Sequence, residues 1–157
     1  MTIKERNNTN KIKTISLFSG AGGLDIGAIM AGAHIVFAND MMKEACMSYS
    51  TNIGSHIING DINSVMNRLD GIEDVDMVIG GPPCQAYSVV GRARMGKAVE
   101  DDPRNELYRY YVNFLERYRP KMFVFENVMG ILSANGGATW MKVQEALRAV
   151  GYEIECH

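Results

Sequence analysis

The sequence predicts an α/β fold with a mostly parallel sheet, because apolar strand segments alternate with helical patterns along almost the whole chain. The first unit is the most informative. A β-branched, apolar segment at residues 14–18 ends in the glycine-rich turn S-G-A-G-G-L-D, and a helical pattern follows as far as Gly32. A strand, a glycine turn and a helix in this order open a doubly wound fold, in which ligands bind at the carboxyl ends of the strands. We therefore expect the strand order 3-2-1-4-5.

The remaining elements follow in order from the spacing of the apolar residues. We expect further strands at residues 34–38, 56–59, 77–79, 122–125 and 152–156. We expect further helices at residues 42–49, 63–69, 106–118 and 138–149. Residues 89–104 have no periodicity and predict a long loop, of the kind that is usually functional or disordered. Residues 1–12 are polar and predict a flexible leader, which leaves residues 13–157 as one domain.

Composition and charge exclude several classes of protein. A chain of 157 residues has room for one domain with a real core, and 46% apolar residues are ordinary for a globular protein. No apolar run approaches the length of a membrane span, so we expect a cytoplasmic protein. Three widely spaced cysteines argue against a disulfide framework and against a zinc site. A net charge of −2 means that any contact with DNA or RNA depends on a local basic patch.

Two acidic residues follow directly after predicted strands. Asp40 lies about 20 residues beyond the glycine turn, where folds of this kind bind the hydroxyls of a ribose. An alternative of comparable weight is that Asp40 caps the helix that follows it. Asp61 stands just past the third strand in the same way. Together with the glycine turn, these acids favour a cofactor that carries both ribose and adenine.

Cys84 is a candidate nucleophile, because it comes after a buried strand, two glycines and two prolines in V-I-G-G-P-P-C-Q. Prolines restrict the backbone and leave the thiol little freedom to move away. The alternative is a small hydrophobic residue in a tight turn, which is the commoner fate of a lone free cysteine. The spacing by itself leaves both interpretations open.

Glu126 follows three apolar residues of the fifth strand, which predicts a partly desolvated carboxyl at the same edge of the sheet. Neighbouring strands lie about 4.8 Å apart, so Cys84 and Glu126 can face one small pocket beside the cofactor. The two side chains would then serve as nucleophile and proton source. The alternative for Glu126 is a loop acid whose oxygens are satisfied by backbone amides.

These motifs together resemble those of the DNA cytosine-5 methyltransferases. The resemblance is carried by F-S-G-A-G-G-L-D at residues 18–25, G-G-P-P-C-Q-A-Y-S at 80–88 and F-E-N-V at 125–128, in that family's order. G-D-I at 60–62 and D-x-R-N at 102–105 fit as well, so the likeness extends from residue 13 onward. P-P-C-Q with E-N-V is specific, since methyltransferases that act on exocyclic amines carry an aromatic residue in place of Cys84.

The resemblance implies a Rossmann-like class I methyltransferase fold that binds S-adenosyl-L-methionine and releases S-adenosyl-L-homocysteine. It implies that the cofactor is bound by Phe18, Ser19, Gly20, Ala21, Gly22, Gly23, Leu24, Asp40, Met41, Asp61, Ile62, Gly80 and Pro82. It implies catalytic roles for Cys84, Glu126 and Asn127. Double-stranded DNA would be held by Gln85, Ser88, Arg92, Arg94 and Arg104. The target cytosine would be flipped out of the duplex and methylated at C5, as in a restriction–modification system.

The family's later motifs, an arginine-rich segment, a target recognition region and a final helix, have no counterpart in this sequence. We therefore expect the N-terminal part of a catalytic domain, truncated on its C-terminal side and inactive without a second chain that carries those motifs. Methylation of tRNA cytosine is a second enzymatic interpretation. A third is a non-catalytic half of a split enzyme that binds a cofactor or a partner.

Overall fold

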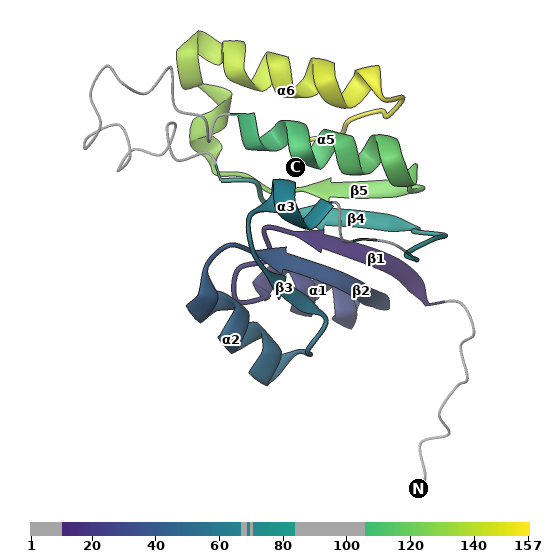
Figure 1. The fold of residues 1–157 in the computed structure, drawn as a ribbon. Helices are drawn as coiled ribbons and strands as arrows, with labels where there is room; N and C mark the ends of the chain where they lie inside the picture. The colour runs from purple at the N-terminus through teal and green to yellow at the C-terminus, as the bar shows by residue number, and fades with distance from the viewer. Residues whose placement is uncertain (1–10, 67–68, 70, 84–105) are drawn as a thin grey trace, which may run out of the picture.

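The computed structural model describes residues 11–66, 69, 71–83 and 106–157, and its five strands form one parallel sheet (Figure 1). The strands are β1 (Ile12–Leu17), β2 (Ala33–Asp40), β3 (Ile57–Asn59), β4 (Met77–Gly80) and β5 (Met122–Phe125). Their order in the sheet is β3-β2-β1-β4-β5, as the sequence predicts. The order reverses at β1, so the neighbouring ends of β1 and β4 are the expected place for a ligand.

β1 is the central strand and is buried on both faces. Four successive residues, Thr14 to Leu17, have no exposed surface. This pattern is typical of a parallel sheet that helices cover on both sides. The register of β1 with β2 shifts between Thr14 and Ile15, which pair with Ile35 and Phe37. The shift gives Val36 no partner in β1 and lets Ile35 and Phe37 join cores on opposite faces of the sheet.

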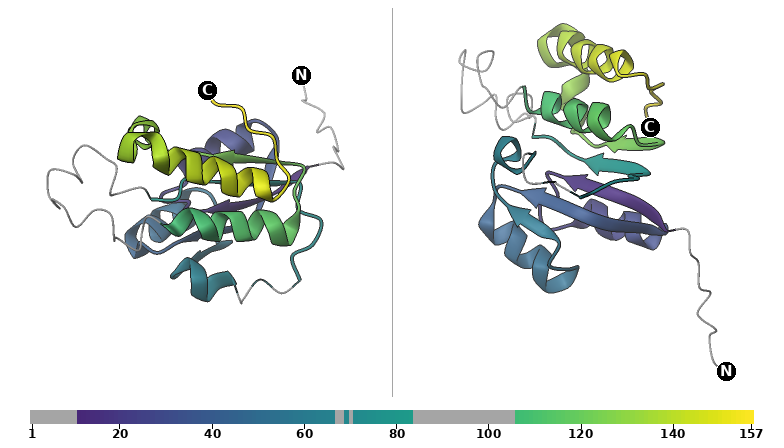
Figure 2. Two further views of the ribbon diagram at one scale, coloured as in Figure 1. Left: turned by 90° about the horizontal axis from the view of Figure 1, so that it is seen from above. Right: turned by 45° about the vertical axis from the view of Figure 1, so that its right-hand side comes forward.

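The helices divide between the two faces of the sheet (Figure 2). α1 (Gly23–Met30) and α2 (Lys43–Asn52) cover one face, where Tyr49 is the largest buried side chain. α3 (Ile62–Met66) and α5 (Leu107–Tyr118) cover the other face. Two short 3-10 helices, η3 (Met129–Leu132) and η4 (Ala134–Gly137), precede α6 (Ala138–Ala149) in the chain. α6 packs beside α5. This is the doubly wound arrangement that the alternating pattern predicts.

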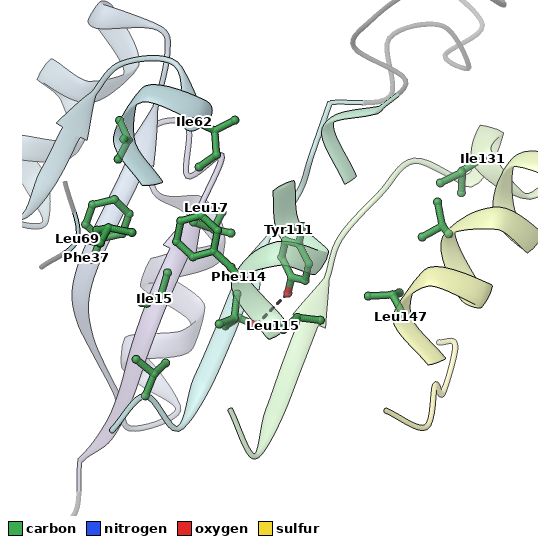
Figure 3. Packing of buried hydrophobic residues seen from close by; sticks show 14 residues of the cluster. Ile15, Leu17, Phe37, Ile62, Leu69, Tyr111, Phe114, Leu115, Ile131 and Leu147 are labelled. Atoms are coloured by element: carbon green, nitrogen blue, oxygen red, sulfur yellow. Dashed lines mark hydrogen bonds between the residues drawn. The ribbon is translucent and has the colours of Figure 1, made fainter. Parts of the chain in front are cut away.

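Tyr111 joins α5 to the sheet within the larger core (Figure 3). Its side chain has no exposed surface, and its hydroxyl lies 2.9 Å from the carbonyl oxygens of both Val78 and Val124. One hydroxyl proton serves two acceptors, one on β4 and one on β5. Burial raises the pKa of Tyr111 well above its ordinary value, so the hydroxyl remains a donor. The tyrosine thus fixes α5 across the two strands that lead to the predicted catalytic residues.

The sequence-based boundaries hold closely for most elements. The helix expected at residues 138–149 and the strand expected at 122–125 are confirmed. β1 ends one residue earlier than expected, because Phe18 has a φ of 54° and leaves the extended conformation. The strand expected at residues 152–156 is wrong, since those residues form no strand in the structure. Tyr152 packs edge-on against Phe123 and donates a hydrogen bond to the Pro120 carbonyl, so its apolar character serves side-chain packing instead of sheet pairing.

Candidate functional site

The glycine-rich turn follows β1 directly and has the conformation that its sequence predicts. Gly20 and Gly22 have φ values of 56° and 92°, in the left-handed region that favours glycine. Gly22 is also packed too tightly for any side chain, because a Cβ atom there would lie 2.1 Å from Ile53 Cδ1 and 2.8 Å from Tyr49 Cδ2. Phe18 has a φ of 54° without being glycine. A strained residue beside a tight turn is common at functional sites.

Asp40 holds the glycine turn from the end of β2. Its Oδ2 accepts a hydrogen bond from the Gly20 amide at 2.8 Å, and its Oδ1 accepts one from the Met42 amide at 2.8 Å. Met42, and not Asp40, is the N-cap residue of α2. Each carboxylate oxygen keeps acceptor capacity, because a carboxylate offers about four lone-pair sites. Asp40 therefore organises the backbone of the turn and still presents acceptors at this edge.

A cavity of about 380 Å³ opens at the carboxyl edge, where the ends of β1, β4 and β5 meet. It is lined by Ser16, Leu17, Phe18, Ser19, Leu24, Asp25, Gly80, Gly81 and Glu126. Phe18, Ser19, Leu24, Gly80 and Glu126 are thus brought together as the sequence predicts. Nine other residues predicted to bind the cofactor are not among the lining residues: Gly20, Ala21, Gly22, Gly23, Asp40, Met41, Asp61, Ile62 and Pro82.

Glu126 stands beside Gly81 at one wall of this cavity. A Cβ atom on Gly81 would lie 2.5 Å from Glu126 Oε2, so only glycine lets the carboxyl take this position. The Glu126 amide also donates to the Gly80 carbonyl at 2.9 Å, which continues the pairing of β4 with β5. The side chain is exposed. The desolvation expected from its apolar neighbours is therefore absent, because Glu126 lies beyond the end of β5 and faces the open cavity.

Asn127 ties together the two segments that leave β4 and β5. Its Nδ2 donates to the Pro82 carbonyl at 3.1 Å, and its Oδ1 accepts from the Val128 amide at 3.0 Å. Pro82 is buried, and Pro83 follows it. This bond anchors the proline segment two residues before Cys84. Asn127 thus has a positioning role that the motif by itself does not reveal.

The residues after β3 lie farther from the cavity. Asp61 Oδ1 accepts from the Asn63 amide at 2.9 Å, at the start of α3. Ile62 is 3% exposed and belongs to the larger core. Met41 is 70% exposed. Six predicted site residues lie outside the described part of the chain: Cys84, Gln85, Ser88, Arg92, Arg94 and Arg104.

Sequence reasoning missed a buried polar network behind the cavity. Asp25 has no exposed surface, and its carboxylate accepts from Ser16 Oγ and from the Tyr49 hydroxyl, each at 2.8 Å. The Tyr49 hydroxyl also lies 3.0 Å from His56 Nε2. The position of Asp25, directly after the apolar Leu24 in a segment predicted to pack on the sheet, could have indicated a buried acid. A buried carboxylate in turn predicts hydrogen-bonding partners, because carboxylates are rarely buried unless paired. The histidine gave none, since nothing in its spacing relates it to residue 25.

A family model decides the classification of this chain. The model for C-5 cytosine-specific DNA methylases matches residues 12–157, which is nearly the whole sequence. The chain belongs to this family.

Two bacterial relatives of this chain are named as type II methyltransferases. The chain is 37% identical to the type II methyltransferase M.NgoFVII of Neisseria gonorrhoeae over 150 residues, covering 96% of this chain and 39% of that protein. It is 40% identical to the type II methyltransferase M.AgeI of Thalassovita gelatinovora, covering 92% of this chain and 34% of that protein. The chain thus spans well under half of the length of these relatives.

Solved structures share the fold of this chain. A prophage-encoded E. coli protein, whose structure is named for a DNA modification methyltransferase, matches with a TM-score of 0.70 and 28% identity, over 88% of this chain and 38% of that one. The methyltransferase EhMeth of Entamoeba histolytica matches with a TM-score of 0.66 and 23% identity, over 93% of this chain and 46% of that one. The second likeness concerns the fold alone. Both matches agree with the predicted Rossmann-like methyltransferase fold.

The described residues contain neither a membrane-spanning helix nor a group of side chains that could bind a metal ion. No helix there has the length and apolar character needed to cross a membrane. No group of three or more His, Cys, Asp or Glu side chains in that part of the chain is placed to hold a metal ion.

Proposed function

We propose that this chain carries the cofactor site and the nucleophile of a DNA cytosine-5 methyltransferase of a restriction–modification system. The observation that carries the proposal is the cavity that joins the glycine turn after β1 to Glu126 after β5, beside the prolines that precede Cys84. The type II methyltransferases among the relatives support it. Because the chain spans 39% of M.NgoFVII, the activity is proposed for a protein in which the rest of such a domain is supplied.

The lining of the cavity fits S-adenosylmethionine. Its volume of about 380 Å³ lies in the range of small-molecule sites, roughly 300–1,000 Å³. Gly80 and Gly81 offer bare backbone on one side, and the Ser19 hydroxyl and the Glu126 carboxyl are accessible for polar contacts. Phe18 would contact the adenine, Ser19 to Leu24 the methionine end, and Asp40 the ribose hydroxyls. Met41 and Asp61-Ile62 would lie beside the adenine, with Gly80 and Pro82 on the opposite side.

The proposed chemistry divides between Cys84 and Glu126. When bound, S-adenosylmethionine supplies an electrophilic methyl group on a positively charged sulfur. The Cys84 thiolate adds to ring C6 of a flipped-out cytosine, which makes C5 a nucleophile toward that methyl. Glu126 holds a proton at ring N3 and stabilises the charge that develops in the ring. C5 then loses its own proton to solvent water, the electron pair of that bond re-forms the double bond between C5 and C6, and the pair of the C6–sulfur bond leaves with Cys84 as the thiolate.

Neighbouring residues support the proposed roles of Cys84 and Glu126. Asn127 holds the Pro82 carbonyl, which fixes the segment that leads to Cys84. Gly81 leaves space for the Glu126 carboxyl. Gln85, Ser88 and the arginines at 92, 94 and 104 would contact the DNA backbone, where basic groups supply affinity independent of sequence. The cytoplasmic location and the second chain stay predictions.

Transfer of labelled methyl groups tests this function. The chain is assayed with double-stranded DNA and with tRNA, alone and mixed with a polypeptide that supplies the remaining length of a relative such as M.NgoFVII. We expect transfer to DNA in the mixture and none that is detectable from the chain alone. Transfer to tRNA in preference to DNA would favour the RNA substrate, and absence of cofactor binding as well as transfer would contradict the proposal.

A prediction for Asp40 follows from its contacts. Asp40→Ala removes the acceptor that holds the Gly20 amide and the proposed acceptor for the ribose hydroxyls. Hydrogen bonds to a charged group contribute about 1.5–3 kcal/mol, so cofactor affinity should fall by at least that amount. Isothermal titration calorimetry with S-adenosylmethionine measures the change.

Asp74→Asn is the control for this measurement. Asp74 is exposed and lies before β4, at the opposite edge of the sheet from the cavity. It has a φ of 54°, which asparagine tolerates well. The control should bind the cofactor as the unchanged chain does. Equal affinity in the Asp40→Ala variant would exclude Asp40 from the cofactor site.

A further inference from the structure

The buried network behind the cavity converges on one carboxylate. Asp25 lies in the first turn of α1, lines the cavity and has no exposed surface. Ser16 Oγ donates to its Oδ2, and the Tyr49 hydroxyl donates to its Oδ1, both at 2.8 Å. Asp25 is therefore held in one orientation by groups from β1 and α2.

The two hydrogen bonds to Asp25 determine which group donates in the neighbouring hydrogen bonds. The Tyr49 hydroxyl has one proton and gives it to Asp25, so His56 Nε2, 3.0 Å away, must donate to the Tyr49 oxygen. Ser16 likewise gives its proton to Asp25, so Ser19 Oγ, 2.9 Å from Ser16 Oγ, is the donor in that pair. The protons of the Ser16 and Tyr49 hydroxyls thus point toward Asp25, while the Ser19 hydroxyl is shared between Ser16 Oγ and the Ser16 carbonyl oxygen at 3.3 Å. This arrangement stabilises a negative charge there.

The directions of the pKa shifts of Asp25, Tyr49 and the half-buried His56 agree with that arrangement. Burial raises the pKa of Asp25, and the hydrogen bonds from Tyr49 and Ser16 oppose the rise. Burial raises the pKa of Tyr49, which keeps its hydroxyl a donor. Burial lowers the pKa of His56, which favours the neutral ring. A cationic ligand in the cavity would lower the pKa of Asp25 and favour its charged form.

The cavity itself is acidic. Its lining has two carboxyls, Asp25 and Glu126, two serine hydroxyls and otherwise apolar residues and glycines. No Lys, Arg or His belongs to the lining that the structure describes. The N-terminal end of α1 offsets only part of the charge on Asp25, since a helix end carries about half of a unit charge. The cavity therefore favours a ligand with positive charge.

We propose that Asp25 determines the selectivity of this site for S-adenosylmethionine over S-adenosylhomocysteine. The inference rests on the proposed function. When C5 of cytosine bonds to the methyl carbon, the electron pair of the sulfur–methyl bond stays on sulfur, and the sulfonium becomes a neutral thioether. The ligand loses one positive charge, while the charge on Asp25 is unchanged. The attraction to Asp25 thus favours the substrate form and weakens the hold on the product.

Asp25→Asn tests the role of the charge with little change of shape. The asparagine Oδ1 can accept from Tyr49 as before. Its Nδ2 can donate to Ser16 Oγ once the Ser16 hydroxyl turns toward Ser19, which lies within hydrogen-bond distance. The network therefore stays satisfied without the charge. Asp25→Ser is a second neutral variant of different size, and circular dichroism and thermal unfolding show that each variant is folded.

Dissociation constants for both cofactor forms, measured by calorimetry, give the result. The unchanged chain should bind S-adenosylmethionine more tightly than S-adenosylhomocysteine. In both neutral variants that ratio should fall roughly tenfold, in the range expected for one charge acting across a partly screened cavity. An analogue with an ammonium group in place of the sulfonium should lose affinity in parallel with S-adenosylmethionine.

Tyr49→Phe is the matched control, because it removes one hydrogen bond from Asp25 and leaves the charge. Any change there should affect both affinities by a common factor, and the ratio should stay that of the unchanged chain. An unaltered ratio in Asp25→Asn and Asp25→Ser would overturn this inference and leave the proposed function standing. Failure of the unchanged chain to bind either form of the cofactor would overturn both.

Discussion

Replacing Cys84 with serine should abolish covalent capture of DNA that contains 5-fluorocytosine. Fluorine at C5 cannot leave as a proton does, so the adduct between the enzyme sulfur and C6 accumulates after methyl transfer. A serine hydroxyl is far less ionised than a thiol at neutral pH and does not add to the ring at a useful rate. Pro82, two residues before Cys84, is held by the Asn127 side chain. The adduct is measured as a species of low mobility on a denaturing gel, with the remaining part of the catalytic domain supplied.

The other two cysteines provide matched controls for this experiment. Cys46 is buried and lies 3.3 Å from the Asp40 carbonyl, whereas Cys156 is exposed and close to the end of the chain. Cys156→Ser removes an accessible thiol far from the prolines, and it should leave the adduct unchanged. An adduct that persists in Cys84→Ser and disappears in Cys156→Ser would show that the nucleophile has been wrongly assigned.

The pattern of apolar residues predicted the sheet well because strands and helices with a continuous apolar signal are recognisable even where the strand lies at the edge of the sheet. Residues 122–125 and 138–149 illustrate this, since each forms the expected element with the expected limits. The strand expected at 152–156 failed for a physical reason. Alternating apolar residues there indicate a buried face, but a strand also needs backbone partners, and Tyr152 instead packs against Phe123. Side-chain burial does not by itself predict backbone pairing.

The site was predictable where motifs bring residues together along the chain, and less so where the fold brings them together. Glu126 and the glycine turn were expected at the same edge of the sheet, and Ser19 and Leu24 of that turn line one cavity there with Glu126. The carboxyl was expected to be desolvated, and it is exposed, because solvent access depends on what stands opposite the strand end. The contact of Asp25 with Tyr49 joins residues 24 positions apart on two helices, and no local pattern encodes it.

Gly80→Ala should be the most destabilising change in the described part of the site. Gly80 ends β4, where it pairs with Leu17 and Phe125. A Cβ atom there would lie 2.3 Å from the Leu17 carbonyl oxygen, which belongs to the backbone of the central strand and cannot rotate away. Overpacking of this kind costs about 1–3 kcal/mol, and the free energy of unfolding should fall by at least that amount. Urea-induced unfolding, followed by circular dichroism, measures the change.

Gly27→Ala makes the same chemical change where the surroundings predict the opposite sign. Gly27 is exposed within α1, and nothing lies within 4 Å of the position that its Cβ atom would take. Alanine at such a helix position is more stable than glycine by about 0.5–1 kcal/mol, because it restricts the unfolded chain. The two variants should therefore move the urea midpoint in opposite directions. Equal midpoints would contradict the prediction. They would mean that the backbones of β1 and β4 lie farther apart at Gly80 than the 2.3 Å distance from its Cβ position to the Leu17 carbonyl oxygen requires.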